Sequence, residues 1–236
     1  MELLIGFGWI ALYFVGAASL ALLFRFLIKI PDEIYRKLLH MILLCSLIVW
    51  VVVFTTWWLA VIAAVAFAII VFPILLIFEK RQKYSQLLTE RKHGELKYSL
   101  LIVFSMFSIV MSVCWGWLGD KYLVLASVFA WGFGDAAAAL IGKRFGKHKI
   151  TWKITDQKKS WEGTIAMFAT ALATVLAILL VRGGLMVAGY IVIPIVTAAV
   201  CAFVELCSRQ GFDTITCPLA AMATILPLVY AFGGLV

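Results

Sequence analysis

The chain has 236 residues, of which 65% are hydrophobic and 14% are charged, and its formal net charge is +8 at pH 7. Soluble domains carry about 25% charged residues, so this composition indicates a membrane protein rather than a soluble one. The basic excess does not indicate a nucleic-acid partner, because no recognition motif accompanies it and basic loops are expected in membrane proteins.

Apolar stretches recur along the whole chain, and about eight of them can cross roughly 30 Å of hydrocarbon as helices. The weakest boundary lies between the second and third stretches, where only the sequence TTWW intervenes. No segment is left for a soluble domain, so we predict an all-α fold: a polytopic helical bundle forming one integral membrane domain over residues 1–236. The predicted spans are residues 3–28, 41–55, 57–78, 98–119, 122–142, 164–181, 185–207 and 217–235.

Basic residues divide unevenly between the two sides of this predicted bundle. The connections after the odd-numbered spans lie on one side and hold all of the 20 lysine and arginine residues except Lys121 and Arg182. The positive-inside rule then places those connections in the cytoplasm and both termini outside.

Ionisable residues gather at the cytoplasmic ends of the predicted spans, and the middles are almost free of charge. A coupled carrier is expected to place its site near the bilayer midplane. The observed pattern suits an enzyme at the cytoplasmic interface, where a lipid headgroup meets a soluble cosubstrate.

The segment KIPDEIYRKLLHM precedes the second predicted span. Its spacing predicts two i,i+4 ion pairs, Asp32–Arg36 and Glu33–Lys37. The simpler interpretation is a surface helix, and spacing alone favours it because exposed pairs are common and weak. The alternative is a phosphate-binding role for Arg36 and Lys37, with His40 beside them at the membrane surface.

The stretch WGFGDAAAALIGKRFGKHK carries a carboxylate inside an apolar run. Asp135, Ala138 and Gly142 fall on one helical face, and the small residues allow close approach of another helix or a substrate chain. Gly142 and Gly146 are predicted to end the helix and turn backbone N–H groups toward an anion. Buried intramembrane carboxylates are usually functional, although Asp135 could instead have only a packing role.

The sequence KKSWEGT follows and supplies Lys158, Lys159, Ser160 and Glu162. Ser160 also fits a helix start. A carboxylate, glycines and lysines are the parts of a nucleotide-phosphate site, but no Walker sequence is present.

Two further polar groups lie at span ends. Glu95 precedes the fourth span and carries little signal alone. In VELCSRQGFDTITCP, Ser208 lies one turn after Glu205 at the end of the seventh span. Gly211, Asp213 and Thr216 form a predicted turn, which can explain Gly211 and Asp213 without function. A turn does not explain Glu205, which lies within the apolar run.

These blocks together resemble the polyprenol kinase family, which includes dolichol kinases, phytol kinases and CTP-dependent diacylglycerol kinases. The family signature runs D-x-x-A-x-x-x-G-x-x-x-G, then a lysine pair, then S/T-x-E-G. The blocks RKLLH, GEL and VELCSRQGFDTITCP also resemble family blocks in the same order. The residues that match the signature are Asp135, Ala138, Gly142, Gly146, Lys158, Lys159, Ser160, Glu162 and Gly163.

The resemblance implies transfer of the γ-phosphoryl group of a nucleoside triphosphate, CTP in much of the family, to a lipid alcohol, with Mg²⁺ as cofactor. It implies catalytic roles for Asp135, Glu162 and Glu205, and metal binding by Asp135, Glu162 and Asp213. Expected phosphate contacts are Arg36, Lys37, Gly142, Gly146, Lys158, Lys159 and Ser160. Further candidates are His40, Glu95, Ser208, Asp213 and Thr216.

Two other functions compete with this one. A phosphatidate cytidylyltransferase would share CTP, magnesium and a cytoplasmic site, but its long carboxylate- and histidine-rich signature is not found near the C-terminus. A transporter or lipid flippase would predict mid-helix polar residues and internal repeats, and the sequence shows neither. The residues do not decide whether the donor is CTP or ATP, or whether the lipid is a polyprenol, phytol or diacylglycerol. The oligomeric state is also open.

Overall fold

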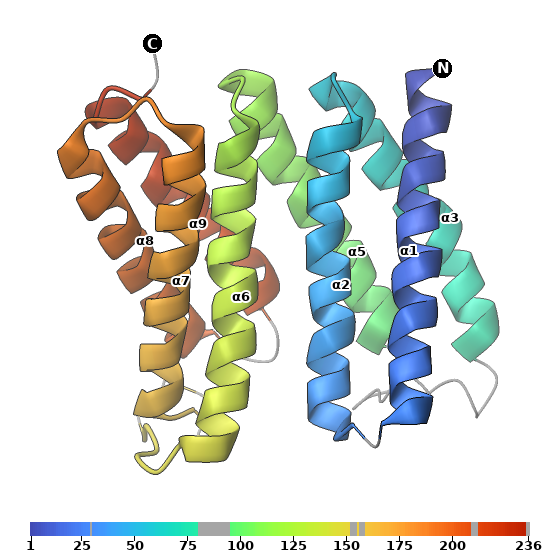
Figure 1. The fold of residues 1–236 in the computed structure, drawn as a ribbon, viewed down its shortest axis with the longest axis horizontal. Helices are drawn as coiled ribbons and strands as arrows, with labels where there is room; N and C mark the ends of the chain where they lie inside the picture. The colour runs from blue at the N-terminus through green and yellow to red at the C-terminus, as the bar shows by residue number, and fades with distance from the viewer. Residues whose placement is uncertain (29, 80–94, 152–154, 156–158, 209–211, 235–236) are drawn as a thin grey trace. The chain divides into compact units, whose positions relative to one another are not determined.

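The computed structural model of the chain describes residues 1–28, 30–79, 95–151, 155, 159–208 and 212–234 (Figure 1). Eight helices within these ranges are long and apolar enough to cross a membrane. The predicted all-α, multi-pass membrane fold is therefore confirmed. The helices are α1 (Glu2–Leu27), α2 (Asp32–Val53), α3 (Trp57–Glu79), α5 (Glu95–Val110), which continues into the π-helix η1 (Met111–Trp117), α6 (Lys121–Phe145), α7 (Trp161–Arg182), α8 (Val187–Cys207) and α9 (Asp213–Ala231).

Several helices extend beyond the predicted apolar spans. Helix α2 begins at Asp32 rather than at residue 41, so the basic segment before the second span is part of the same helix. Helix α9 begins at Asp213 rather than at residue 217, and Pro218 lies inside it. Hydropathy marks only the apolar part of a helix, whereas polar residues in the end turns continue it to the membrane surface.

The chain divides into two compact units, residues 1–109 and residues 110–236, which are described separately. A single integral membrane domain stays a prediction. In the first unit, α1 packs against α2 and α3. Aromatic rings fill its interior: the ring of Phe104 lies 5.9 Å from Trp50 and 5.2 Å from Phe67, measured between centroids.

The short TTWW connection between α2 and α3 is closed by the first turn of α1. A carboxylate oxygen of Glu2 accepts hydrogen bonds from the Thr55 N–H (2.8 Å), the Thr55 hydroxyl (2.9 Å) and the Thr56 N–H (3.3 Å). These donors precede α3, whose first backbone N–H groups have no partner within the helix. Glu2, which is 53 positions from Thr55 in the sequence, therefore supplies the hydrogen-bond partner at the short connection between α2 and α3.

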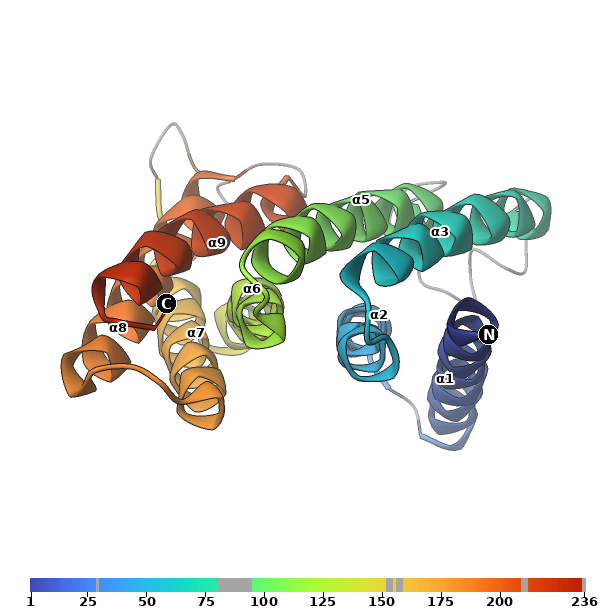
Figure 2. The same cartoon turned by 90° about the horizontal axis from the view of Figure 1, so that it is seen from above.

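The second unit is built from η1 and the last four helices. Helix α6 packs against α7 and α9, and α8 also packs against α7 and α9 (Figure 2). Consecutive helices run in opposite directions, so the end of α6, the start of α7, the end of α8 and the start of α9 lie at the same end of the unit (Figure 1).

An arginine joins three chain segments at the opposite end of the second unit. The Arg182 Nε lies 2.5 Å from the Asp120 carboxylate, and the guanidinium also donates to the backbone carbonyls of Gly183 (3.0 Å) and Gly234. Asp120 caps α6 at the same time, accepting from the N–H groups of Tyr122 and Leu123. The Arg182 and Asp120 side chains are only 10% and 12% exposed, so each charge depends on the other.

Replacing Arg182 by Gln is expected to destabilise the protein by about 3 kcal/mol, because it leaves the Asp120 charge largely buried without its cation. In an Asp120→Asn background, which keeps the capping oxygen, the same replacement should cost less. Thermal unfolding in detergent of the native protein, the two single variants and the double variant measures this difference. Equal losses in both backgrounds would contradict the pairing.

Candidate functional site

Glycine packing brings the backbones of α6 and α7 into close contact at the site end of the second unit. A Cβ atom added at Gly163 would lie 3.0 Å from the Ala138 carbonyl oxygen and 3.4 Å from the Gly142 Cα. A Cβ at Gly142 would lie 3.3 Å from the Ser160 hydroxyl and 3.5 Å from the Gly163 Cα. The small residues of the signature thus form a helix contact of the type that membrane proteins favour.

Gly146 ends α6, as the sequence predicts, but Gly142 lies inside the helix. The Gly146 N–H donates to the Gly142 carbonyl at 3.1 Å. A Cβ at Gly146 would clash with that carbonyl oxygen and would lie 2.6 Å from the Ser160 hydroxyl. The Gly146 N–H is therefore part of the helix end, and the predicted phosphate contacts of both glycines stay predictions.

The connection between α6 and α7 is closed at its base by backbone hydrogen bonds. The Ile150 N–H donates to the Lys159 carbonyl and the Trp161 N–H to the His148 carbonyl, both at 3.0 Å. These bonds form an isolated antiparallel bridge between Lys149 and Ser160. Lys158 lies outside the described residues, so its predicted phosphate contact is not placed.

Ser160 is the N-cap of α7, which confirms the predicted helix start. Its hydroxyl accepts a hydrogen bond from the Gly163 N–H at 3.3 Å, and its carbonyl accepts one from the Thr164 hydroxyl at 3.2 Å. The residue is 3% exposed, enclosed by the glycines of the α6–α7 contact. The structure therefore gives Ser160 a structural role at the helix start. Its phosphate contact stays a prediction.

Glu162 contacts His148, a residue that the sequence analysis did not select. The His148 ring Nδ1 lies 2.7 Å from the Glu162 carboxylate, and the His148 backbone N–H donates to both carboxylate oxygens at 3.2 and 3.3 Å. Glu162 thus holds the start of the connection that follows α6. A histidine two residues after Gly146 was the available signal, but its spacing to Glu162 matches no recognised motif.

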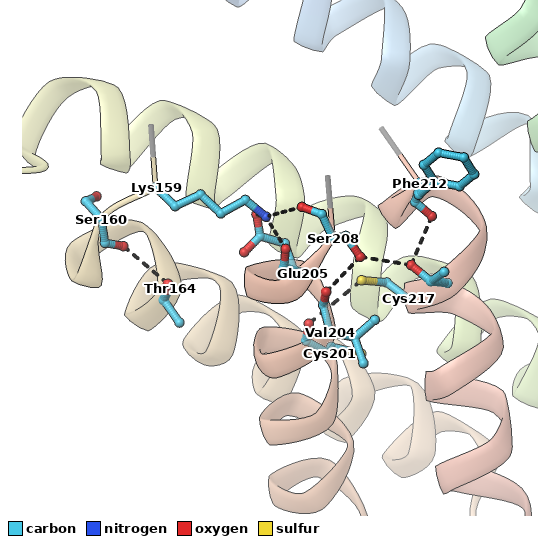
Figure 3. Close-up of polar contacts among 10 residues, drawn as sticks. Lys159, Ser160, Thr164, Cys201, Val204, Glu205, Ser208, Phe212 and Cys217 are labelled. Atoms are coloured by element: carbon cyan, nitrogen blue, oxygen red, sulfur yellow. Dashed lines mark hydrogen bonds and ion pairs between the residues drawn. The ribbon is translucent and has the colours of Figure 1, made fainter. Parts of the chain in front are cut away.

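Lys159 and Glu205 form the central polar contact of the site (Figure 3). The Lys159 Nζ lies 2.9 Å from the Glu205 carboxylate. It also donates to the backbone carbonyls of Glu205 and Ser208, the latter at 3.1 Å. The side chains of Lys159 and Glu205 are 19% and 11% exposed. The cation therefore links the start of α7 to the last turn of α8.

Hydroxyl groups join the end of α8 to the start of α9. The Ser208 hydroxyl donates to the Val204 carbonyl at 2.7 Å and lies 3.0 Å from the Thr216 hydroxyl, which donates to the Phe212 carbonyl at 2.9 Å (Figure 3). Ser208 and Thr216 therefore have structural partners. Their participation in binding or catalysis stays a prediction.

Three carboxylates from different helices share this end of the unit. The charges of Asp135 on α6 and Asp213 on α9 both act on the Glu205 carboxylate of α8. Within the described ranges, no group of three or more His, Cys, Asp or Glu side chains is arranged to hold a metal ion. Mg²⁺ usually takes one or two protein carboxylates together with substrate phosphates, so Asp135 and Asp213 fit such an ion in their chemistry.

The remaining candidate residues belong to the first unit. The predicted Asp32–Arg36 pair is wrong: Arg36 pairs with Glu33 instead, and Asp32 lies 3.3 Å from Arg25. Arg25 also lies over the Tyr35 ring, which holds it beside Asp32 across the short connection between α1 and α2.

The other candidates of the first unit are placed only by their helices. Lys37 and His40 lie half-buried on α2, and Glu95 is the first residue of α5. Their predicted roles at the site stay predictions.

Comparison with known proteins gives one informative relative. No protein-family model matches the chain, and no solved structure matches it. A phytol kinase from Synechocystis sp. is 28% identical over 235 residues, covering 94% of this chain and 90% of the relative. The chain is therefore similar to this phytol kinase over nearly its whole length. The resemblance inferred from the motifs is confirmed, and the similarity covers both units.

Replacing Gly163 by Ala is expected to destabilise the protein by about 1–3 kcal/mol, because the added methyl group meets backbone atoms that cannot rotate away. Gly16→Ala on α1 is the matched control, because a Cβ added at Gly16 would have no neighbouring atom within 4 Å. Thermal unfolding of both variants measures the difference. A Gly163→Ala protein as stable as the Gly16→Ala control would show that the close contact is not required.

Proposed function

We propose that this protein transfers the γ-phosphoryl group of a nucleoside triphosphate to the hydroxyl of a membrane lipid alcohol. The observation that carries the proposal is the similarity to a phytol kinase over 94% of the chain. The arrangement of the signature residues that the structure describes supports it, because they lie toward one polar end of the second unit. A lipid alcohol can keep its apolar chain in the bilayer while its hydroxyl reaches this end.

The proposed reaction forms a bond between the lipid hydroxyl oxygen and the γ-phosphorus. The bond between the γ-phosphorus and the β–γ bridging oxygen breaks, and the nucleoside diphosphate leaves. The hydroxyl proton passes to a carboxylate, for which Asp135 is our candidate. Such a transfer depends mostly on positioning the two substrates and on neutralising the charge of the phosphates. In this proposal the Asp135 carboxylate positions the lipid hydroxyl, and the lysines of the α6–α7 connection neutralise the phosphates.

The donor and the ion are further parts of the proposal. We favour CTP as the donor and Mg²⁺ as the ion, with Asp135 and Asp213 as the residues that would hold it. When bound, Mg²⁺ neutralises the charge of the phosphates. Glu162 and Glu205 each join two segments of the chain, so we assign them to the organisation of the site.

The basic residues also suggest the side of the membrane. The connection between α6 and α7 carries five lysines, and the positive-inside rule therefore favours the cytoplasm for this end. The phosphate-neutralising roles of Arg36 and Lys37 stay predictions from the sequence.

The proposal is tested with the purified protein in lipid vesicles containing magnesium and a mixture of phytol, polyprenol and diacylglycerol. CTP is labelled at the γ-phosphorus in one sample and at the α-phosphorus in another, and the lipid phase is counted. Label arriving only from the γ position is expected. Competition by unlabelled ATP then identifies the donor.

Label arriving only from the α position would overturn the proposal in favour of a cytidylyltransferase. Transfer from neither position, with an intact fold and with ATP also tested as the donor, would leave a transporter or flippase as the better account.

A further inference from the structure

The Lys159 ammonium group has three N–H donors and three oxygen partners within the protein. These are the Glu205 carboxylate at 2.9 Å, the Ser208 carbonyl at 3.1 Å and the Glu205 carbonyl. Figure 3 shows the side chain reaching from the start of α7 to the end of α8. A phosphate oxygen would have to displace one of these partners to contact the ammonium group.

The position of the cation suits the end of α8. The last carbonyl groups of a helix have no partner within it, and a positive charge there is favourable for the helix dipole. The Ser208 N–H closes the helix onto the carbonyls of Val204 and Glu205, and Lys159 supplies donors to carbonyls of the same turn. Lys159 therefore acts as a helix cap from another segment of the chain.

Glu205 needs this cation for a second reason. The residue is 8% exposed, and the negative charges of Asp135 and Asp213 both act on its carboxylate. A buried carboxylate that experiences the negative charge of other carboxylates is unfavourable unless a cation compensates it. Lys159 is the cation whose contact with Glu205 the structure describes.

We propose that Lys159 is a positioning residue that holds the end of α8, and with it Glu205, against the start of α7, and that it is not a phosphate ligand. The sequence motif predicts a phosphate contact for Lys159, and the structure leads us to revise that role. Its catalytic consequence rests on the proposed function, but its structural part does not. The hydrogen bonds of the Lys149–Ser160 bridge hold the Lys159 carbonyl and the Trp161 N–H, and so position the backbone from which the Lys159 side chain extends.

The test is a double-mutant cycle with Lys159→Gln, Glu205→Gln and the double variant. Lys159→Gln is expected to lower the unfolding temperature in detergent by on the order of 10 °C, because it leaves the Glu205 charge without its cation. The double variant, which has neither charge, should unfold at a higher temperature than Lys159→Gln alone. Lys143→Gln, which removes an exposed lysine from the end of α6, is the control and should change little.

Kinetics separate the positioning role from phosphate binding. A positioning residue predicts a lower kcat for Lys159→Gln with a KM for the nucleotide within about twofold of the native value. Lys159→Arg keeps the cation and should recover part of both the stability and the rate. If Lys159→Gln does not fold, Lys159→Arg and the double variant still complete the comparison.

Two results would overturn the inference. One is an unfolding temperature of Lys159→Gln equal to that of Lys143→Gln, or no gain in the double variant. The other is a KM for the nucleotide raised about tenfold at unchanged kcat, which is the signature of a lost phosphate contact. If the native protein transfers no phosphoryl group, the proposed function fails while the thermal cycle still decides the role of Lys159.

Discussion

The close contact between α6 and α7 is the constraint on which the rest of the site depends. Two backbones can approach this closely only because Gly142 and Gly163 have no side chains where the helices meet. The contact sets where α7 begins, and the Ser160 cap and the bridge at the base of the connection follow from it. Asp135 lies two turns before Gly142 on the same helix, so the glycines also fix its carboxylate relative to α7.

Charges in the second unit are compensated at both ends of the helices, in different ways. At one end, Arg182 contacts the Asp120 carboxylate and two backbone carbonyl groups. The two charges of this pair compensate each other. At the other end, Lys159 compensates Glu205, but Asp135 and Asp213 add negative charge to the same region. Carboxylates beside a basic connection are groups from which a site for a metal-bound polyphosphate can be built. We therefore propose this end as the reactive one.

Much of the fold could be predicted from the sequence because hydropathy and helix-start signals are local. The number of spans, the helix start at Ser160 and the helix end at Gly146 all depend on neighbouring residues. The start of α2 was missed because its first turns are charged, and a hydropathy window records them as a loop. The family resemblance rested on motifs that are also local in the chain.

The partners within the site could not be predicted, because they join distant segments. Lys159 and Glu205 are 46 positions apart, Arg182 and Asp120 are 62 apart, and Glu162 and His148 are 14 apart on opposite sides of a connection. Spacing in a sequence predicts which residues share a helical face, but it does not predict which helix lies opposite. For this reason Glu162 and Lys159 were assigned to ligands, whereas the structure gives both of them protein partners.

The most direct test of the central claim is the rate of γ-phosphoryl transfer to lipid alcohol by Asp135→Asn, compared with the native protein at matched unfolding temperature. The substitution keeps the size of the side chain and removes its charge. If Asp135 of α6 and Asp213 of α9 form the reactive site, transfer should fall by about 10²-fold or more while the fold is retained. Full activity in Asp135→Asn would contradict the account and place the chemistry elsewhere in the chain.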